Sequence, residues 1–137
     1  MSNTITLTFD NSLPSVGETI TLTQTDSLGN EEIILFTYVA FNTVVDFGIP
    51  IDVSSTIPQN ITNADSVSFT FQQYLNSSLY LVEYVSVAKV KITSLNANFA
   101  ITNGSSTFDG VTFEIVIVPT TIQRINVRSP FFINAPV

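Results

Sequence analysis

Short segments in which apolar residues alternate with threonine are the feature that most constrains the fold of this chain. In "TITLTF" the residues Ile5, Leu7 and Phe9 share one side, and "TITLTQT" at 19–25 and "VTFEIVIV" at 111–118 repeat the period. A period of two is that of a β-strand with one buried face. We therefore expect a mainly β fold, in which the two similar "TITLT" segments are strands that could pair with each other.

The composition agrees with this interpretation. The 137 residues suffice for one ordinary domain with a single core. Only 11% of them are charged, against about 25% in an average globular protein, and 18 Thr, 15 Ser and 12 Asn take their place. Threonine favours strands, whereas serine and asparagine favour turns. The sequence predicts a single-domain antiparallel sandwich or open barrel over residues 1–128.

Turn signals divide the chain into further strands. "DSLGN" at 26–30 is typical of a tight turn, and Asn103-Gly104 and Asp109-Gly110 are expected to close hairpins. "EIILFTYVAF" (32–41) is apolar on both faces, as a central strand covered on both sides would be. Residues 42–62 hold two prolines and little period, which favours a mostly irregular connection. "LYLVEYVSVAKVKIT" (79–93) is long for one strand, so a bend or a hairpin is expected near Val87–Lys89, and "TIQRINV" (121–127) is expected to be a last short strand.

One stretch, "NADSVSFTFQQYLNSS" (63–78), fits two structures. Alternation from Val67 to Phe71 suits a strand. A helix would instead place five residues on one face: Val67, Phe71, Tyr74, Leu75 and Ser78. The run after Phe71 breaks the alternation, so we favour a single short helix. Two residues could cap its start: Asn63 and Asp65.

The charges are few and unevenly distributed. Residues 1–88 contain nine Asp and Glu and no Lys or Arg, and the whole chain has a net charge of −7. Nucleic-acid binding needs clustered cations that displace counterions, so it is not expected. Membrane association is not expected either, because the N-terminal segment does not have the pattern of a signal peptide and no apolar run approaches roughly 18–20 residues. The four cations are Lys89, Lys91, Arg124 and Arg128.

The chain lacks side chains on which most enzymes depend. It has no His and no Cys, which removes the commonest general base, the thiolate nucleophile and the usual zinc ligands. We predict no enzyme activity, no cofactor and no metal, although a calcium site built from separate loops stays open. The weak catalytic candidates, interpreted as solvated groups, are the pairs Asp46/Asp52 and Glu83/Glu114 and a serine, Ser86 or Ser94, near Lys89 and Lys91.

The quoted segments also carry a resemblance. "TITLTF…VGETITLT", "NADSVSFTFQQYLNSSLYL" and "VSVAKVKITSLNANFAI" resemble the small β-rich virion structural proteins of tailed phages that infect Bacteroidetes. This resemblance implies a structural role and supplies no catalytic residue. It implies a self-associating subunit of a tail, connector or capsid surface, assembled in the host cytoplasm with other virion proteins.

A carbohydrate-binding or adhesion module of an extracellular surface is the alternative. Sugar sites are commonly built on exposed aromatic rings, and the chain has no Trp. We interpret its four tyrosines as core or interface residues in preference to rings on which a sugar stacks. These are Tyr38, Tyr74, Tyr80 and Tyr84.

The segment "RSPFFINAPV" suggests how copies could meet. Leaving Phe131, Phe132 and Ile133 in water would forgo several kcal/mol, because each buried Phe is worth about 1.5–3 kcal/mol. We expect residues 129–137 to be an extended C-terminal arm that reaches a neighbouring copy; folding back over their own sandwich is the alternative. The acidic part of one copy could also meet the Lys89/Lys91 or Arg124/Arg128 region of the next, head to tail.

Overall fold

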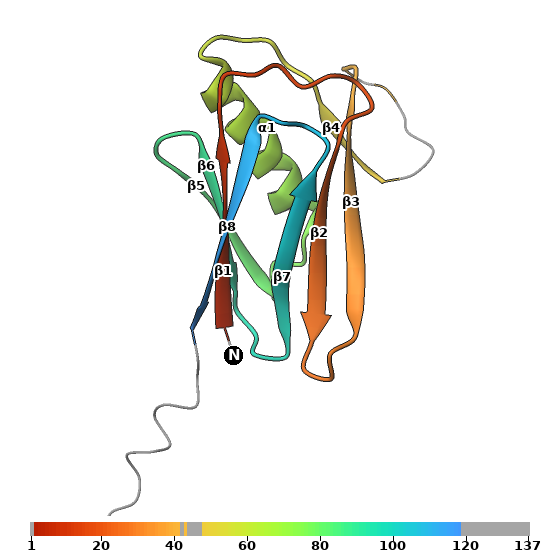
Figure 1. Cartoon of the computed structure of the whole chain (residues 1–137), viewed down its shortest axis with the longest axis vertical. Coiled ribbons are helices and arrows are strands. Elements are labelled where there is room, and N and C mark those ends of the chain that lie inside the picture. Colours follow the sequence, from red (N-terminus) through yellow and green to blue (C-terminus); the bar gives the residue numbers. More distant parts are fainter. Residues whose placement is uncertain (1, 42, 44–47, 119–137) are drawn as a thin grey trace, which may run out of the picture.

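The computed structural model describes residues 2–41, 43 and 48–118 and shows a β-sandwich with one helix (Figure 1). Two four-stranded sheets, here called sheet A and sheet B, pack face to face. The strands are β1 (Ser2–Phe9), β2 (Thr19–Asp26), β3 (Glu31–Val39), β4 (Ile49–Asp52), β5 (Tyr80–Val85), β6 (Lys89–Ser94), β7 (Phe99–Ser106) and β8 (Val111–Val118), and the helix is α1 (Gln59–Tyr74).

Sheet A has the strand order β5-β6-β1-β8, and every neighbouring pair is antiparallel. Ile5 in β1 lies between Ile92 of β6 and Ile115 of β8. Ile5, Leu7 and Phe9 are all buried, whereas the threonines between them are half-buried on the outer side. The alternation in "TITLTF" therefore determines which face of the sheet forms the core.

Sheet B has the order β4-β3-β2-β7 and supplies the other half of the core. The edge strand β4 runs parallel to β3, and the other pairs are antiparallel. The register of β2 against β7 shifts after Thr23, which leaves one additional residue, Thr102, as a bulge in β7. Gly104 follows it in β7, where a Cβ atom would come within 2.5 Å of the Phe113 ring of β8. The glycine thus lets an aromatic ring from sheet A pack against sheet B.

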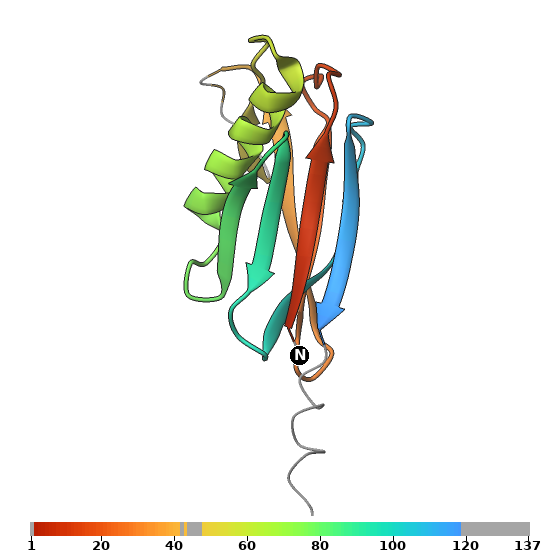
Figure 2. The ribbon, with the colours of Figure 1, turned by 90° about the vertical axis from the view of Figure 1, so that its left-hand side faces the viewer.

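Helix α1 closes one side of the sandwich. It lies along the margin where β5 ends sheet A and β4 ends sheet B (Figure 2). Val67 and Phe71 point inward and are fully buried, and the Phe71 ring centroid is 4.5 Å from that of Phe36 in β3. The helix is therefore part of the core.

A buried polar contact also joins the two sheets. The side-chain amide of Asn3 in β1 donates a hydrogen bond to the carbonyl of Ile101 in β7. The hydroxyl of Ser94 in β6 donates to the Asn3 side-chain oxygen over 2.6 Å. Asn3 and Ser94 are both buried, and buried polar groups need such partners. We call this group the Asn3 clamp.

Most of the predicted architecture is confirmed. The fold is mainly β with one helix, and its two packed sheets make it a sandwich instead of an open barrel. Residues 79–93 form a hairpin, β5–β6, with its turn before Lys89. The turn at 26–30 joins β2 to β3, and the Asp26 carboxylate accepts hydrogen bonds from the backbone N–H groups of Leu28 and Asn30.

The helix prediction was right in kind and wrong in its limits. The helix begins at Gln59, after Pro58, and ends at Tyr74, whereas 63–78 was expected. Neither Asn63 nor Asp65 caps it. Asn63 is buried in the second turn, where its amide donates to the carbonyls of Asp10 and Ser12.

Other sequence interpretations were wrong for non-local reasons. The two "TITLT" strands lie in different sheets and do not pair. Residues 42–62 contain β4 and the first turn of α1. Asn103-Gly104 lies inside β7 and forms no turn. Asp109-Gly110 is a turn, but it joins β7 of sheet B to β8 of sheet A, so the two strands do not form a hairpin. In β3 the outer face is covered only toward the end of the strand: Val39 there is 2% exposed, whereas Ile33 near the start is 60% exposed.

The expected strand at 121–127 and the expected arm at 129–137 lie outside the described residues. Across the described part of the chain, no helix has the length and apolar character to cross a membrane.

Candidate functional site

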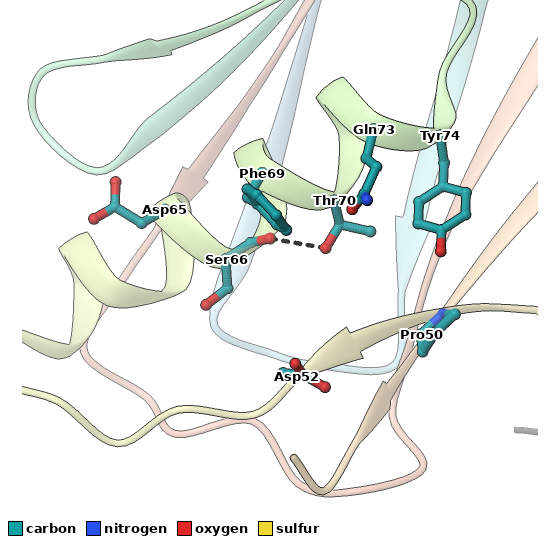
Figure 3. Close-up of a pocket in the computed structure, with 8 residues that line it drawn as sticks. All are labelled: Pro50, Asp52, Asp65, Ser66, Phe69, Thr70, Gln73 and Tyr74. Atoms are coloured by element: carbon teal, nitrogen blue, oxygen red, sulfur yellow. Dashed lines mark hydrogen bonds between the residues drawn. The ribbon is translucent and has the colours of Figure 1, made fainter. Parts of the chain in front are cut away.

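A groove lies between α1 and β4. Its volume is about 480 Å³, within the usual range of ligand sites. Figure 3 shows the helix above and the strand below, with Asp52 and Pro50 on the strand. The helix contributes Asp65, Ser66, Phe69, Thr70, Gln73 and Tyr74.

The helical wall of the groove combines aromatic surface with negative charge. Phe69 is 67% exposed and Tyr74 is 52% exposed, which is unusual for rings on a helix that also packs into a core. Asp65 and Asp52 are exposed carboxylates, and the segments that build the groove contain no Lys or Arg. The groove therefore offers a negative field beside apolar faces.

This wall is held firmly in place. On its inner side α1 is fixed by the Asn63 amide, and the Gln72 side chain donates to the carbonyl of Val82 in β5. The hydroxyl of Thr70 donates to the carbonyl of Ser66 over 2.9 Å, within the same helix (Figure 3). Because the inner side is anchored, the outer side presents Phe69 and Tyr74 without a large rearrangement.

A smaller hollow of about 230 Å³ lies on the other side of the helix, beside β5. Its most notable group is Tyr80, whose hydroxyl donates to the side-chain oxygen of Gln24 in β2 over 2.8 Å. Burial, with a smaller effect of Glu32, raises the pKa of Tyr80 to about 12. The phenol stays neutral at ordinary pH and serves as a contact between the sheets.

The four tyrosines considered as sugar platforms divide into two groups. Tyr38 and Tyr80 are buried in the core, and burial together with Glu18 raises the pKa of Tyr38. Tyr74 and Tyr84 are exposed, by 52% and 38%. Only Tyr74 of these lines the groove.

Lys89 and Lys91 project from the outer face of sheet A, the face toward the viewer in Figure 2. In register, one row across the four strands reads Glu83, Lys91, Thr6 and Glu114. Glu83 is thus the direct neighbour of Lys91, and Glu114 lies one strand further on, beyond Thr6. Together with Lys89, the face carries two acids and two cations. The neighbouring row contains Leu81 and Val116, which are 45% and 51% exposed.

Two of the weak catalytic candidates, the Glu83/Glu114 pair and Ser94 with the lysines, do not come together. Glu83 and Glu114 are three strand spacings apart, about 14 Å, whereas the carboxyl pairs of glycosidases lie roughly 5–9.5 Å apart. Ser94 points into the core and binds Asn3, on the opposite face of β6 from Lys89 and Lys91. No group of three Asp or Glu side chains converges as a metal site within residues 2–41, 43 and 48–118.

Several predicted site residues lie outside the described residues. They are Asp46, Arg124, Arg128, Phe131, Phe132 and Ile133. The groove itself was missed from the sequence. Phe69 offered a signal, because it falls on the helical face opposite Phe71 and so had to be exposed once the stretch was a helix.

Comparisons with known proteins do not assign the chain to a family. No protein-family model matches it, and no match is found among curated proteins or solved structures.

Proposed function

We propose that this protein is a non-enzymatic structural subunit that self-associates, as a virion protein of a phage tail, connector or capsid surface would. The observation that supports this most is the outer face of sheet A. It is built from four regular strands, and its central row has charges of both signs.

The row is complementary to itself. A second copy, turned over about an axis along β1, places its Glu114 opposite Lys91 and its Lys91 opposite Glu114. The same rotation places Thr93 opposite Val116 of the second copy, so the exposed Val116 side chain is covered as well. Such a contact is isologous and closes into a dimer.

Charge reversal tests this contact. Lys91→Glu places like charges opposite each other, which costs several kcal/mol in an interface, and each 1.4 kcal/mol is about tenfold in Kd. We expect Lys91→Glu and Glu114→Lys each to shift the protein to monomer in sedimentation velocity, and the double variant to restore the dimer. Glu31→Lys, an exposed charge reversal in sheet B, is the matched control and should keep the wild-type mass. Single variants that sediment as the wild type would overturn the proposed face.

The virion assignment has a separate test. Purified particles from the native source, analysed by mass spectrometry and immunogold electron microscopy, should contain this chain at a fixed copy number. If cells that express the chain release particles without it, the virion role is wrong. Self-association would then be tested by the charge-reversal experiment alone.

One observation favours the alternative of a carbohydrate-binding or adhesion module. The groove presents two exposed rings, Phe69 and Tyr74, beside hydrogen-bonding groups, and sugars bind to such surfaces. A glycan array, read beside the mass in solution, separates the two functions: sugar binding by a monomer supports the module, and oligomers without sugar binding support the structural subunit.

A further inference from the structure

We propose that the groove between α1 and β4 receives residues 124–132 of a second copy, with an arginine on its carboxylates and a phenylalanine on its exposed rings. This inference rests on the proposed self-association but uses a different surface from the face of sheet A. The contact is heterologous, because groove and segment are different parts of the chain.

The chemistry of the groove selects its occupant. Its two carboxylates have no cation on the elements that build it, and its exposed rings are Phe69 and Tyr74. Arginine pairs with carboxylates and stacks on aromatic faces, so an Arg followed by an aromatic side chain satisfies both features. Only four cations occur in the chain, and two of them, Arg124 and Arg128, stand seven and three residues before Phe131.

The spacing fits as well. In an extended chain, residues of equal parity point to the same side, so Arg124, Arg128 and Phe132 would share one side. From Arg128 to Phe132 such a chain spans about 13 Å. Along α1, Asp65 and Tyr74 are separated by nine residues, which is also about 13 Å along the helix axis, and they project from opposite sides of the helix (Figure 3). A segment with Arg128 at Asp65 therefore has to cross the helical wall obliquely to bring Phe132 toward Tyr74.

The fold favours an occupant from another copy. Strand β8 lies at the opposite edge of sheet A from the helix, and it ends beside the start of β1, away from the start of α1 (Figures 1 and 2). The end of β8 therefore lies on the side of the molecule remote from the groove (Figure 1). Pro130 would not disturb docking through side chains, since its missing N–H is needed only in a strand ladder.

Binding of the isolated segment is the first test. The probe is a fluorescein-labelled peptide of residues 121–137, titrated by anisotropy against the full chain. The acceptor carries Arg124→Ser, Arg128→Ser, Phe131→Ser and Phe132→Ser to silence its own segment, and Lys91→Glu to remove the sheet A contact. We expect saturable binding, with Kd raised about three- to tenfold by Asp65→Asn and by Phe69→Ala. Glu31→Gln is the matched control and should leave Kd unchanged.

Engineered cysteines distinguish one copy from two. Because the chain has no native cysteine, a Gln73→Cys protein mixed with a Pro130→Cys protein of different mass should form a mixed disulfide dimer under mild oxidation. A chain that carries both cysteines and cross-links only within itself would overturn binding between copies.

Three results would overturn the occupant itself: no peptide binding, binding that the groove variants do not weaken, or a sugar from a glycan array whose binding Phe69→Ala abolishes. Since the acceptor carries Lys91→Glu, these results leave the sheet A contact untouched. Failure of the charge-reversal experiment would likewise leave the peptide result standing.

Discussion

Truncation of Phe71 tests whether α1 is part of the core. Its side chain is fully buried, and its ring packs 4.5 Å from Phe36 across the sandwich. Cutting a buried Phe to Ala costs about 3–5 kcal/mol, out of a typical stability of roughly 5–15 kcal/mol. Most of the loss is the empty volume between helix and sheet, and about 0.5–1.5 kcal/mol is the ring pair itself.

Urea unfolding followed by far-UV circular dichroism measures the effect, because the chain has no Trp for fluorescence. We expect Phe71→Ala to lower the free energy of unfolding by about 3–5 kcal/mol. At roughly 4 °C per kcal/mol for a domain of this size, Tm should fall by about 12–20 °C.

Phe69→Ala is the matched control, because it makes the same chemical change two residues away on a ring that is 67% exposed. Any gain in helix propensity is shared by both variants, so their difference isolates burial. The control should stay within about 0.5 kcal/mol of the wild type. Equal losses in the two variants, or a loss below about 1 kcal/mol for Phe71→Ala, would refute the placement of the helix in the core.

Three further perturbations follow from contacts between the sheets. Asn3→Ala leaves buried partners unsatisfied and should lower the free energy of unfolding in urea by about 2–4 kcal/mol. In a double-mutant cycle, adding Ser94→Ala to Asn3→Ala should lower it little further. Additive losses would argue against the Asn3 clamp. Gly104→Ala places a methyl group on the Phe113 ring and should lower the free energy of unfolding by about 1–3 kcal/mol. In a Phe113→Ala background this loss should be smaller, and an equal loss in both backgrounds would contradict the contact. Since the folded pKa of Tyr80 is raised from 10.0 to about 12, its contribution to stability is complete below pH 10 and is lost as the pH rises through 12. The free energy of unfolding of Tyr80→Phe should depend less on pH in that window than that of the wild type, and an unchanged slope would count against the burial of the phenol.

The sequence predicted what local patterns determine. Ile5, Leu7 and Phe9 alternate with threonines, so the inner face of β1 was readable before its partners were known. The partners were not readable, because β1 and β2 carry the same "TITLT" pattern and nothing local states that they belong to different sheets. Strand pairing is decided by the whole core.

The groove escaped prediction for a related reason. It joins Asp52 of β4 to side chains of α1, and β4 is four residues long with a proline in it. Pro50 is tolerated there because β4 is an edge strand, but in the sequence it reads as a break. A parallel pairing with β3 adds no hairpin signal that would reveal the strand.

The position of β1 has a consequence for how the chain folds. Its two neighbours in sheet A are β6 and β8, so the first strand of the sequence is completed only by the last described one. Closing such distant contacts costs loop entropy before any core forms, which places this domain among slowly folding β-proteins. During synthesis β1 has no partner strand until β6 has emerged from the ribosome. Until then its apolar face is exposed and both its edges lack hydrogen-bond partners. Dilution from denaturant should therefore show slow, single-phase folding in which the sheet A residues gain hydrogen-exchange protection together, and a fast phase that protects β1 alone would contradict this order.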